Sequence, residues 1–384
     1  MMYAYPKTQN GRAKRSKPRV LLLLQGVHHL MLYENMFRHC TTVEWCCLLP
    51  ARPKDLPAEG LAEVERLFFR HGVRFFSDSQ SALAHVTEID AVVTTWSVPH
   101  PKHLVVLPFI ALAYEVGLPV FELQHGLFQI GLTYSEDGAF SGSGDGVATA
   151  LPEARNLVCD SLEWFGDGGI GYPRLDGEER DREDGITRKR SVTFVTNHHW
   201  SIIADGERRN CYRIMADAIS AVPDADFVLL PHGGEMKSED FQAMTASLDS
   251  AGIANYRIEM RRFDGVYDTL LQHTDLIVAS ISTTLLDCEM AGTPTVLFRN
   301  PSQQSLLDAL QSKVTVGTSQ ELIGTIRDVL YRGYRPYVTT GFLTPFRADV
   351  LEDRILTAID WSARKPRPDI LVAAARYLGL LTRT

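Results

Sequence analysis

Residues 275–299 read DLIVASISTTLLDCEMAGTPTVLFR and hold a strand, a turn and a helix in one run. The apolar stretch at 275–282 predicts a buried strand, the helical pattern that follows ends at Gly292, and 293–299 predicts another strand. Strand–helix–strand units of this kind build parallel sheets. Three residues with hydroxyl side chains, Ser282, Thr283 and Thr284, connect the first strand to its helix.

This Ser-Thr-Thr turn predicts a phosphate site. The amides of a first helical turn have no partner inside the helix and lie at the positive end of its dipole, and neighbouring hydroxyls add donors. Glu289 lies about two turns further along the helix, where a carboxylate can reach a ribose diol. The alternative is an ordinary helix cap, because Ser and Thr are common there.

Apolar runs rich in β-formers alternate with helical patterns along the whole chain, which is typical of parallel sheets covered on both faces. We therefore expect an α/β protein with two doubly wound Rossmann-like domains facing a cleft. The expected domains are residues 1–176, a charged linker at 177–190, residues 191–344 and a helical tail at 345–384. The runs that predict strands are 18–26, 43–50, 73–77, 90–96, 118–126 and 155–161, then 191–199, 225–234, 256–260, 275–282, 293–299 and 313–319.

Composition narrows the function classes. The chain has 384 residues, of which 45% are hydrophobic, so it is too long for one core and ordinary for two domains. A net charge of −8 argues against a nucleic-acid binder and favours a small molecule or a glycan as the partner. The six cysteines show no CxxC spacing and are expected to be reduced core thiols of a cytoplasmic protein.

Membrane contact is expected to be peripheral at most. No apolar stretch approaches the ~20 residues that a transmembrane helix needs. The basic residues at 11–19 predict a short disordered leader, which can also touch anionic lipid at the inner face of the cytoplasmic membrane.

Polar clusters follow several of the predicted strands, where ligands of an open α/β sheet bind. His125 is the expected general base, since a neutral imidazole there can take a proton from a hydroxyl. His28 and His29 follow the first strand and are expected to line the same side. Each histidine could equally be a loop residue bonded to backbone, and no spacing predicts a catalytic metal. The clusters are Gln124-His125-Gly126, Asn197-His198-His199 and Pro231-His232-Gly233-Gly234-Glu235.

These motifs carry a resemblance to a known family. In this order along the chain, QHG (124–126), GYPRLD (171–176), the His-Gly loop (232–234) and the Ser-Thr-Thr turn with Glu289 resemble the glycosyltransferase-B architecture. They are similar in particular to bacterial capsule, teichoic-acid and lipopolysaccharide transferases, including the CDP-glycerol glycerophosphotransferase-like group.

The resemblance implies roles for individual residues. His125 resembles the histidine that activates the acceptor, and His232 resembles the one that contacts the donor phosphates. The turn at 282–284 matches the donor phosphate turn, and Glu289 the acid near the ribose. Relatives often have His-Pro at His232-Gly233, and Glu122 and Asp264 are the two candidates for an acidic base. The expected donor-side residues are Asn197, His198, His232, Gly233, Ser282, Thr283, Thr284 and Glu289, and the acceptor-side residues are Gln124, Gly126, His28 and His29.

The expected function is a glycosyltransferase or polyol-phosphate transferase of bacterial surface-polysaccharide biosynthesis. Its donor would be CMP-, CDP- or UDP-linked and its acceptor a glycan or lipid-linked glycan, with no cofactor or protein-bound metal. One alternative is a non-hydrolysing UDP-sugar 2-epimerase, although the Asp-Ser-Gly-Gly turn of those enzymes is replaced by 280–284. The other is an inactive module that binds a glycan or a partner enzyme.

Overall fold

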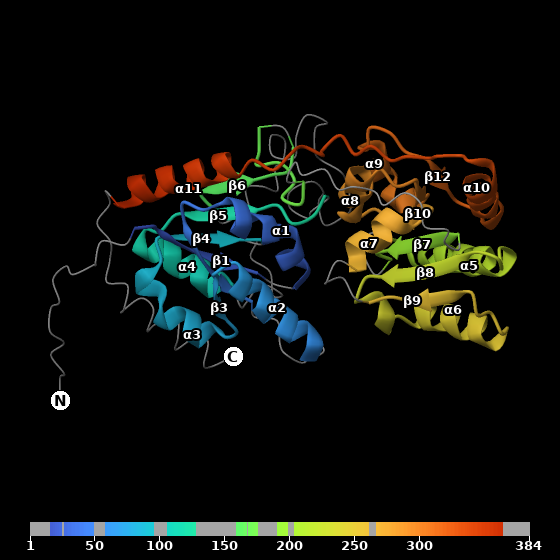
Figure 1. Cartoon of the computed structure of the whole chain (residues 1–384), viewed down its shortest axis with the longest axis horizontal. Coiled ribbons are helices and arrows are strands. Elements are labelled where there is room, and N and C mark those ends of the chain that lie inside the picture. Colours follow the sequence, from blue (N-terminus) through green and yellow to red (C-terminus); the bar gives the residue numbers. More distant parts are fainter. Residues whose placement is uncertain are drawn as a thin grey trace.

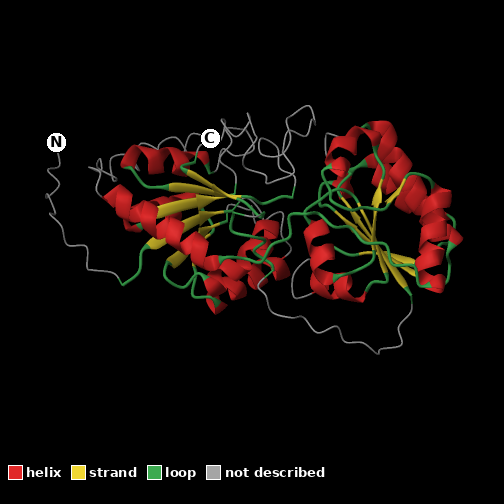
Figure 2. Ribbon diagram, turned by 90° about the horizontal axis from the view of Figure 1, so that it is seen from above, coloured by secondary structure: helices red, strands yellow, loops and turns green. Residues whose placement is uncertain are grey.

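Two parallel six-stranded sheets organise the chain (Figure 1). The computed structural model describes residues 16–24, 27–49, 58–95, 106–127, 159–166, 168–175, 190–198, 203–260 and 266–363. Helices lie on both sides of each sheet (Figure 2). Double coverage explains why the inner strands are mostly apolar and buried, whereas the edge strands at 74–76 and 256–258 have exposed residues.

The first sheet has the strand order β3-β2-β1-β4-β5-β6. Val20 of the central β1 pairs with Trp45 on one side and Ala91 on the other, so β1 and β4 are neighbours across the reversal of strand order. The elements of this half are β1 (Arg19–Leu23), α1 (Val27–His39), β2 (Glu44–Leu48), α2 (Ala58–Arg70), β3 (Arg74–Phe76), α3 (Ser79–Ala84), the 3-10 helix η2 (Val86–Glu88), β4 (Ala91–Thr94), α4 (Leu107–Val116), β5 (Val120–Leu123) and β6 (Ser161–Glu163).

The second sheet has the order β12-β11-β10-β7-β8-β9, which is the order of the first sheet read from its opposite edge. Here β7 and β10 are the neighbours at the reversal, with Phe194 opposite Val278. The elements are β7 (Ser191–Thr196), α5 (Asp205–Ala221), β8 (Asp226–Pro231), η5 (Glu235–Lys237), α6 (Glu239–Ser250), β9 (Tyr256–Ile258), α7 (Val266–His273), β10 (Leu276–Ala279), α8 (Thr284–Ala291), β11 (Thr295–Phe298), η6 (Pro301–Gln303), α9 (Gln304–Asp308), β12 (Thr315–Val316), α10 (Ser319–Arg332) and α11 (Ala348–Ala363).

The predicted fold class is confirmed, and each predicted strand region holds a strand of the structure. The predicted boundaries of one strand were wrong. The strand expected at 155–161 is β6, Ser161–Glu163, and overlaps the prediction only at its last residue. Asp160 fixes its start, because a carboxylate oxygen of Asp160 accepts the N–H of Val120 beside it (2.8 Å). The expected linker, 177–190, lies almost entirely outside the described residues.

Two segments distant in sequence cross between the halves. The N–H of Tyr172 donates to Thr344 O (2.8 Å), and the N–H of Arg347 donates to Ile170 O (2.7 Å). After this crossing α11 lies along the first half, as Figure 1 shows. There the Glu352 carboxylate accepts the N–H of Thr42, and Arg354 pairs with buried Glu163. The helix of the expected C-terminal tail therefore packs on the first half.

The carboxyl edges of the two sheets meet at this junction. The N–H of Leu127, beyond β5, donates to Thr283 Oγ1 at the start of α8 (3.0 Å). Leu127 and Tyr172 share one buried apolar cluster with Val195 and Ile281, so the core continues from one half into the other. The strand ends of both sheets therefore face a common space.

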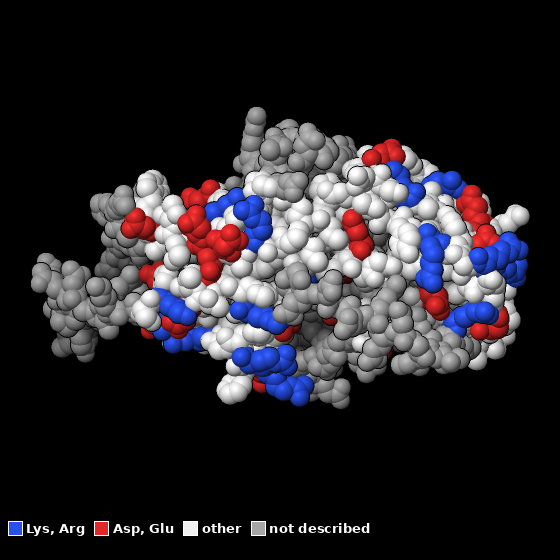
Figure 3. All heavy atoms as spheres, turned by 45° about the horizontal axis from the view of Figure 1, so that its top comes forward, with Lys and Arg blue, Asp and Glu red and all other residues white. Residues whose placement is uncertain are grey.

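The described surface carries mixed charge. Lys and Arg side chains lie beside Asp and Glu side chains on the face in Figure 3. Within the described ranges, no helix is both long enough and apolar enough to span a bilayer.

The crossing of the two segments requires glycine at position 171, and this requirement can be tested. Its φ is +71°, and a Cβ there would lie 1.9 Å from Pro345 O and 2.6 Å from the Pro345 carbonyl carbon. We expect Gly171→Ala to reduce the free energy of unfolding by about 3 kcal/mol or more, because left-handed strain is added to a backbone overlap.

Gly72→Ala is the matched control. Gly72 also has a positive φ, +64°, but its added Cβ meets nothing within 4 Å. It should cost only about 1 kcal/mol of strain. Equal losses in urea unfolding for the two variants would contradict the tight crossing.

Candidate functional site

Ligands of open α/β sheets bind beyond the carboxyl ends of the strands, where the strand order reverses. In the second half this switch point lies between β7 and β10. Ser280 N donates to Val195 O (3.0 Å), which places the loop after β10 directly against the end of β7. Asn197 and the turn at 282–284 are thereby brought to one place, and their role in donor binding stays a prediction.

Buried polar atoms without a partner gather at this switch point. Among the described residues, Asn197 Oδ1, Ser280 Oγ and Ser282 Oγ are buried and make no hydrogen bond. Such atoms are costly unless something else satisfies them. One amide oxygen and two hydroxyls in adjacent loops are the groups that a polar ligand would use. Sequence reasoning does not predict a ligand contact for Ser280, because Ser280 falls inside the strand predicted at 275–282.

The Ser-Thr-Thr turn is not an ordinary helix cap. Thr283 has helical backbone angles and makes no side-chain capping bond, so that alternative is wrong for its hydroxyl. Instead Thr283 Oγ1 accepts the N–H of Leu127 from the other half. The N–H groups of Leu285 and Leu286 donate to Ser282 O and Thr283 O, so an anion would meet residues 282–284 themselves.

Glu289 makes a structural contact with Thr340 that the sequence did not indicate. One of its carboxylate oxygens accepts both the N–H of Thr340 (2.9 Å) and the Thr340 hydroxyl (2.6 Å). This ties α8 to the segment that leads back to the first half. Its contact with a ribose stays a prediction.

His232 is exposed at the end of β8, and its ring orientation is fixed by a neighbour. The N–H of Gly234 donates to His232 Nδ1 (3.2 Å), so Nδ1 carries the lone pair and a neutral ring carries its proton on Nε2. His232 can therefore offer an Nε2–H donor to an anion. Gly233 is exposed beside it and leaves space around its backbone.

A buried carboxylate, Glu235, holds this loop in place. One oxygen accepts the N–H of His232 (2.8 Å) and the Thr196 hydroxyl (3.0 Å), and the other accepts the Tyr212 hydroxyl (2.7 Å). Burial raises the pKa of Glu235, and these donors oppose that shift. Sequence reasoning quoted Glu235 but gave it no role. Its position three residues after His232 in a strand-end loop was the available signal.

His198 lies below the surface of the site. Its ring is fully buried between Tyr212 and Phe298, and its Nδ1 is 3.6 Å from a Glu235 carboxylate oxygen. The ring therefore supports the Glu235 cluster in this structure. Its predicted contact with a donor stays a prediction.

The first half brings two predicted histidines together at its own switch point, between β1 and β4. The ring centroids of His29 and His125 lie 4.7 Å apart with the ring planes tilted by 56°, and both rings contact Thr95, the residue after β4. His29 Nδ1 is 3.2 Å from Thr95 Oγ1, and His125 Nδ1 is 2.6 Å from Thr95 O. Thr95 was not singled out from the sequence.

The contact with Thr95 decides the tautomer of His125. A carbonyl oxygen only accepts, so His125 Nδ1 must carry the proton and Nε2 the lone pair of a neutral ring. That is the protonation state of a general base. His125 and His232 thus present opposite functions at Nε2, an acceptor on one and a donor on the other.

The remaining acceptor-side candidates divide into two groups. The Gln124 side chain is buried, donating to Gly126 O (2.8 Å) and accepting the N–H of Phe165 (2.9 Å), so it shapes the loop that carries His125. Glu122 is buried within β5. His28 lies on α1, but its side chain is outside the described part, as is the whole of Asp264.

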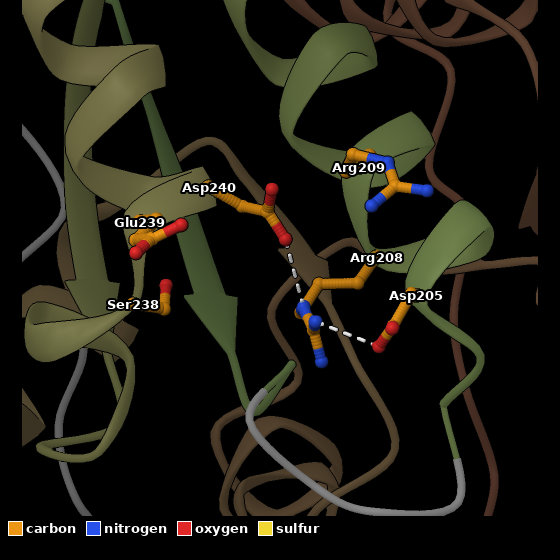
Figure 4. Close-up of a pocket in the computed structure, with 6 residues that line it drawn as sticks. All are labelled: Asp205, Arg208, Arg209, Ser238, Glu239 and Asp240. Carbon is orange, nitrogen blue, oxygen red and sulfur yellow. Dashed lines mark hydrogen bonds and ion pairs between the residues drawn. The ribbon is translucent and has the colours of Figure 1, made fainter.

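A cavity of about 450 Å³ lies at the starts of α5 and α6, the helices that follow β7 and β8. Arg208 lies between Asp205 and Asp240 there, with its Nε 3.0 Å from Asp240 and an Nη 2.8 Å from Asp205 (Figure 4). Three carboxylates outnumber two guanidinium groups, so this cavity suits phosphate less well than the turn at 282–284. The lining residues are Asp205, Arg208, Arg209, Ser238, Glu239 and Asp240.

Another unsatisfied donor follows β11. Gln303 Nε2 is buried and makes no hydrogen bond to the described residues, while Gln303 Oε1 accepts from Asn300 Nδ2 (3.1 Å). The described residues hold no group of three His, Cys, Asp or Glu side chains arranged to bind a metal ion.

Comparison with known proteins supports the fold. No protein-family model and no curated protein sequence matches the chain. Solved structures do match over nearly their whole length. S. aureus MnaA, solved with UDP, shares 11% identity at a TM-score of 0.58, covering 91% of this chain and 99% of that one. The UDP-GlcNAc 2-epimerase from Neisseria meningitidis, bound to UDP-GlcNAc, shares 12% at 0.56, covering 88% and 100%.

The corresponding epimerase from Methanocaldococcus jannaschii, in complex with UDP-GlcNAc and UDP, shares 13% identity at a TM-score of 0.55 and covers 88% of this chain and 99% of that one. Identities this low establish the architecture alone. Two facing doubly wound domains with a returning C-terminal helix form the glycosyltransferase-B fold, and this chain has that fold.

The Glu235 cluster predicts a pH dependence. The pKa of Glu235 is raised from its ordinary 4.5 by burial, so its contribution to stability is fully present below that value and is lost as pH rises through the folded value. Glu235→Gln removes this titration. The difference in melting temperature, variant minus wild type, should therefore grow as pH rises from 4 to 8.

Glu321→Gln is the control of opposite sign. The pKa of Glu321 is lowered, chiefly by the N–H of Gly317, so its stabilisation is present above the ordinary 4.5 and lost as pH falls. A Glu235→Gln difference that is constant across this pH range would show that burial does not control this carboxylate.

Proposed function

We propose that the cleft binds a nucleotide-activated sugar or polyol and that the chain transfers this group to an acceptor hydroxyl. The observation that carries the proposal is the gathering of unpartnered Asn197, Ser280 and Ser282 atoms at the switch point of the second sheet. The Leu127–Thr283 contact holds the loop of His125 against the same turn. Donor groups and a candidate base thus belong to one space.

The proposed chemistry follows from the two histidines. His125 Nε2 accepts the proton of the acceptor hydroxyl while that oxygen bonds to the transferred group. The bond from this group to the leaving nucleotide phosphate breaks, and the phosphate gains negative charge. Fixed donors at 282–284 and the Nε2–H of His232 stabilise that charge without reorganisation.

The donor and acceptor classes rest on different supports. A nucleotide-sugar donor is supported by the shared fold, because the similar structures are named with UDP or UDP-GlcNAc. A CMP- or CDP-linked donor, a glycan acceptor, surface-polysaccharide synthesis and peripheral membrane contact are supported by the motif resemblance alone.

A UDP-sugar 2-epimerase is the second candidate, and the similarity to solved epimerases favours it. Inversion at C2 must break the C2–H bond, so an epimerase in D₂O would place deuterium on a UDP-sugar without any acceptor. A transferase would leave that carbon unlabelled. The inactive binding module is the third possibility and predicts neither labelling nor transfer.

A nucleotide panel tests the donor site. CMP, CDP, UDP, GDP and ADP are added to the purified chain, and a nucleotide at 100 times its Kd should stabilise the fold by about 2.7 kcal/mol. Ser282→Ala should weaken the best ligand by about tenfold or more, the loss of one hydrogen bond to a charged group. Calorimetry measures both.

Ser220→Ala serves as the control, because Ser220 is exposed and its hydroxyl donates to Ala216 O within α5. It should leave nucleotide affinity unchanged. Ser282→Ala with undiminished affinity would remove the turn from the donor site, and the absence of any nucleotide response in folded protein would leave only the binding module.

The role of His125 has its own test. We expect His125→Ala to lower turnover by about 10²–10⁴-fold, the range for a lost general base, while nucleotide Kd stays near the wild-type value. Single-turnover kinetics and calorimetry on the same preparation separate the two effects. Loss of nucleotide binding would instead assign His125 to structure or donor binding.

A further inference from the structure

The segment Tyr172–Arg174 reaches from the first half to α8, the helix that follows the proposed phosphate turn. Asp287 is the fourth residue of α8 and is buried, although it is charged. Its two carboxylate oxygens accept the hydroxyls of Tyr172 and Tyr267, each at 2.8 Å. Arg174 Nε lies 3.2 Å from the same carboxylate.

A carboxylate in this position creates an electrostatic problem for an anion site. A negative charge in the first turn stabilises a helix, because it complements the positive end of the dipole. The same charge repels a phosphate that approaches that end, and burial strengthens the repulsion by removing water. Asp287 would therefore oppose donor binding at residues 282–284 if it stood alone.

Arg174 removes this opposition. Its guanidinium is buried beside Asp287 and also pairs with Asp268 on α7, so it neutralises the acidic charge in the first turn of α8. Asp268 is partly exposed, and water screens its charge. The cation that makes α8 suitable for phosphate thus comes from the other half of the chain.

The backbone that carries Arg174 is held on both sides. Asn35 Nδ2 of α1 donates to Pro173 O (2.9 Å), and the N–H of Tyr172 donates to Thr344 O (2.8 Å). These contacts anchor the segment to the first half and to the returning chain. The position of Arg174 relative to α8 therefore depends on how the halves are joined.

We propose that Arg174 is a positioning residue for the donor phosphate turn, which it serves by neutralising Asp287 and fixing α8 against the first half. This inference rests on the proposed function, since it concerns the affinity of that site for a nucleoside diphosphate. It assigns a role to the Arg of the GYPRLD segment, which the motif resemblance left without one.

The test measures Kd for UDP and CDP by calorimetry on the full chain. Arg174→Met leaves the Asp287 charge unpaired and should raise Kd by about tenfold. Asp287→Asn removes the charge and should leave Kd within about twofold of wild type or lower it. The double variant Arg174→Met/Asp287→Asn should recover most of the affinity that Arg174→Met loses, because no buried carboxylate without a cation then remains in the first turn of α8.

Arg354→Met is the matched control. Arg354 also joins two distant segments by pairing with a buried carboxylate, Glu163, but it lies on α11 and its other hydrogen bond goes to Gly168 O. It should lower the melting temperature while leaving Kd within about twofold of wild type. A purely structural role for Arg174 would make the two arginine variants behave alike.

The outcomes separate the inference from the proposed function. Unchanged Kd in Arg174→Met, or no recovery in the double variant, would overturn the inference while wild-type binding keeps the proposed function. Absence of UDP and CDP binding in wild type would overturn both. If Arg174→Met does not fold, Asp287→Asn decides alone, since a tenfold loss of affinity there would contradict charge neutralisation.

Discussion

The crossing of residues 170–175 with 344–347 is the constraint on which the rest of the structure depends. Each sheet by itself would place its strand ends at an edge exposed to water. The backbone bonds of Tyr172 and Arg347 fix the two halves so that those edges face one another. Gly171 permits the crossing because the partner backbone occupies the place of a side chain. The shared apolar cluster then makes the arrangement stable.

The polar network at the junction buries charged side chains, and removing them from water costs free energy that apolar packing would not. Asp287, Arg174 and Glu235 are all buried, and the pKa values of both carboxyls are raised by burial. Buried charges of this kind are seldom the most stable solution, since apolar side chains often replace them without loss. Their position beneath His232 and beside the turn at 282–284 gives them a use, because they fix backbone and charge where the proposed donor binds.

The two histidines show how neighbouring backbone assigns chemistry to identical side chains. Thr95 O accepts from His125 Nδ1, whereas Gly234 N–H donates to His232 Nδ1. The first contact leaves a lone pair on Nε2 and the second leaves a proton there. One fold therefore presents an acceptor atom and a donor atom from the same residue type, and the difference arises from which backbone group each ring nitrogen Nδ1 meets.

Sequence alone determined the fold class, the strands and the loops that carry polar groups, because apolar periodicity reports burial and Gly, Ser and Thr mark the turns between elements. It also singled out His125, His232 and the turn at 282–284 as candidates, and their roles stay predictions. It did not find Thr95, Ser280, Glu235 or the Arg174–Asp287 pair. Thr95 and the Arg174–Asp287 pair meet partners tens to more than a hundred positions away, and no local pattern encodes such a distance. Only the tertiary structure decided that Glu289 ties down Thr340, that Gln124 shapes its loop and that an arginine from one half pairs with a carboxylate in the other. The physical reason is that each of these side chains finds a partner that lies far away in the sequence and comes close only in the folded chain.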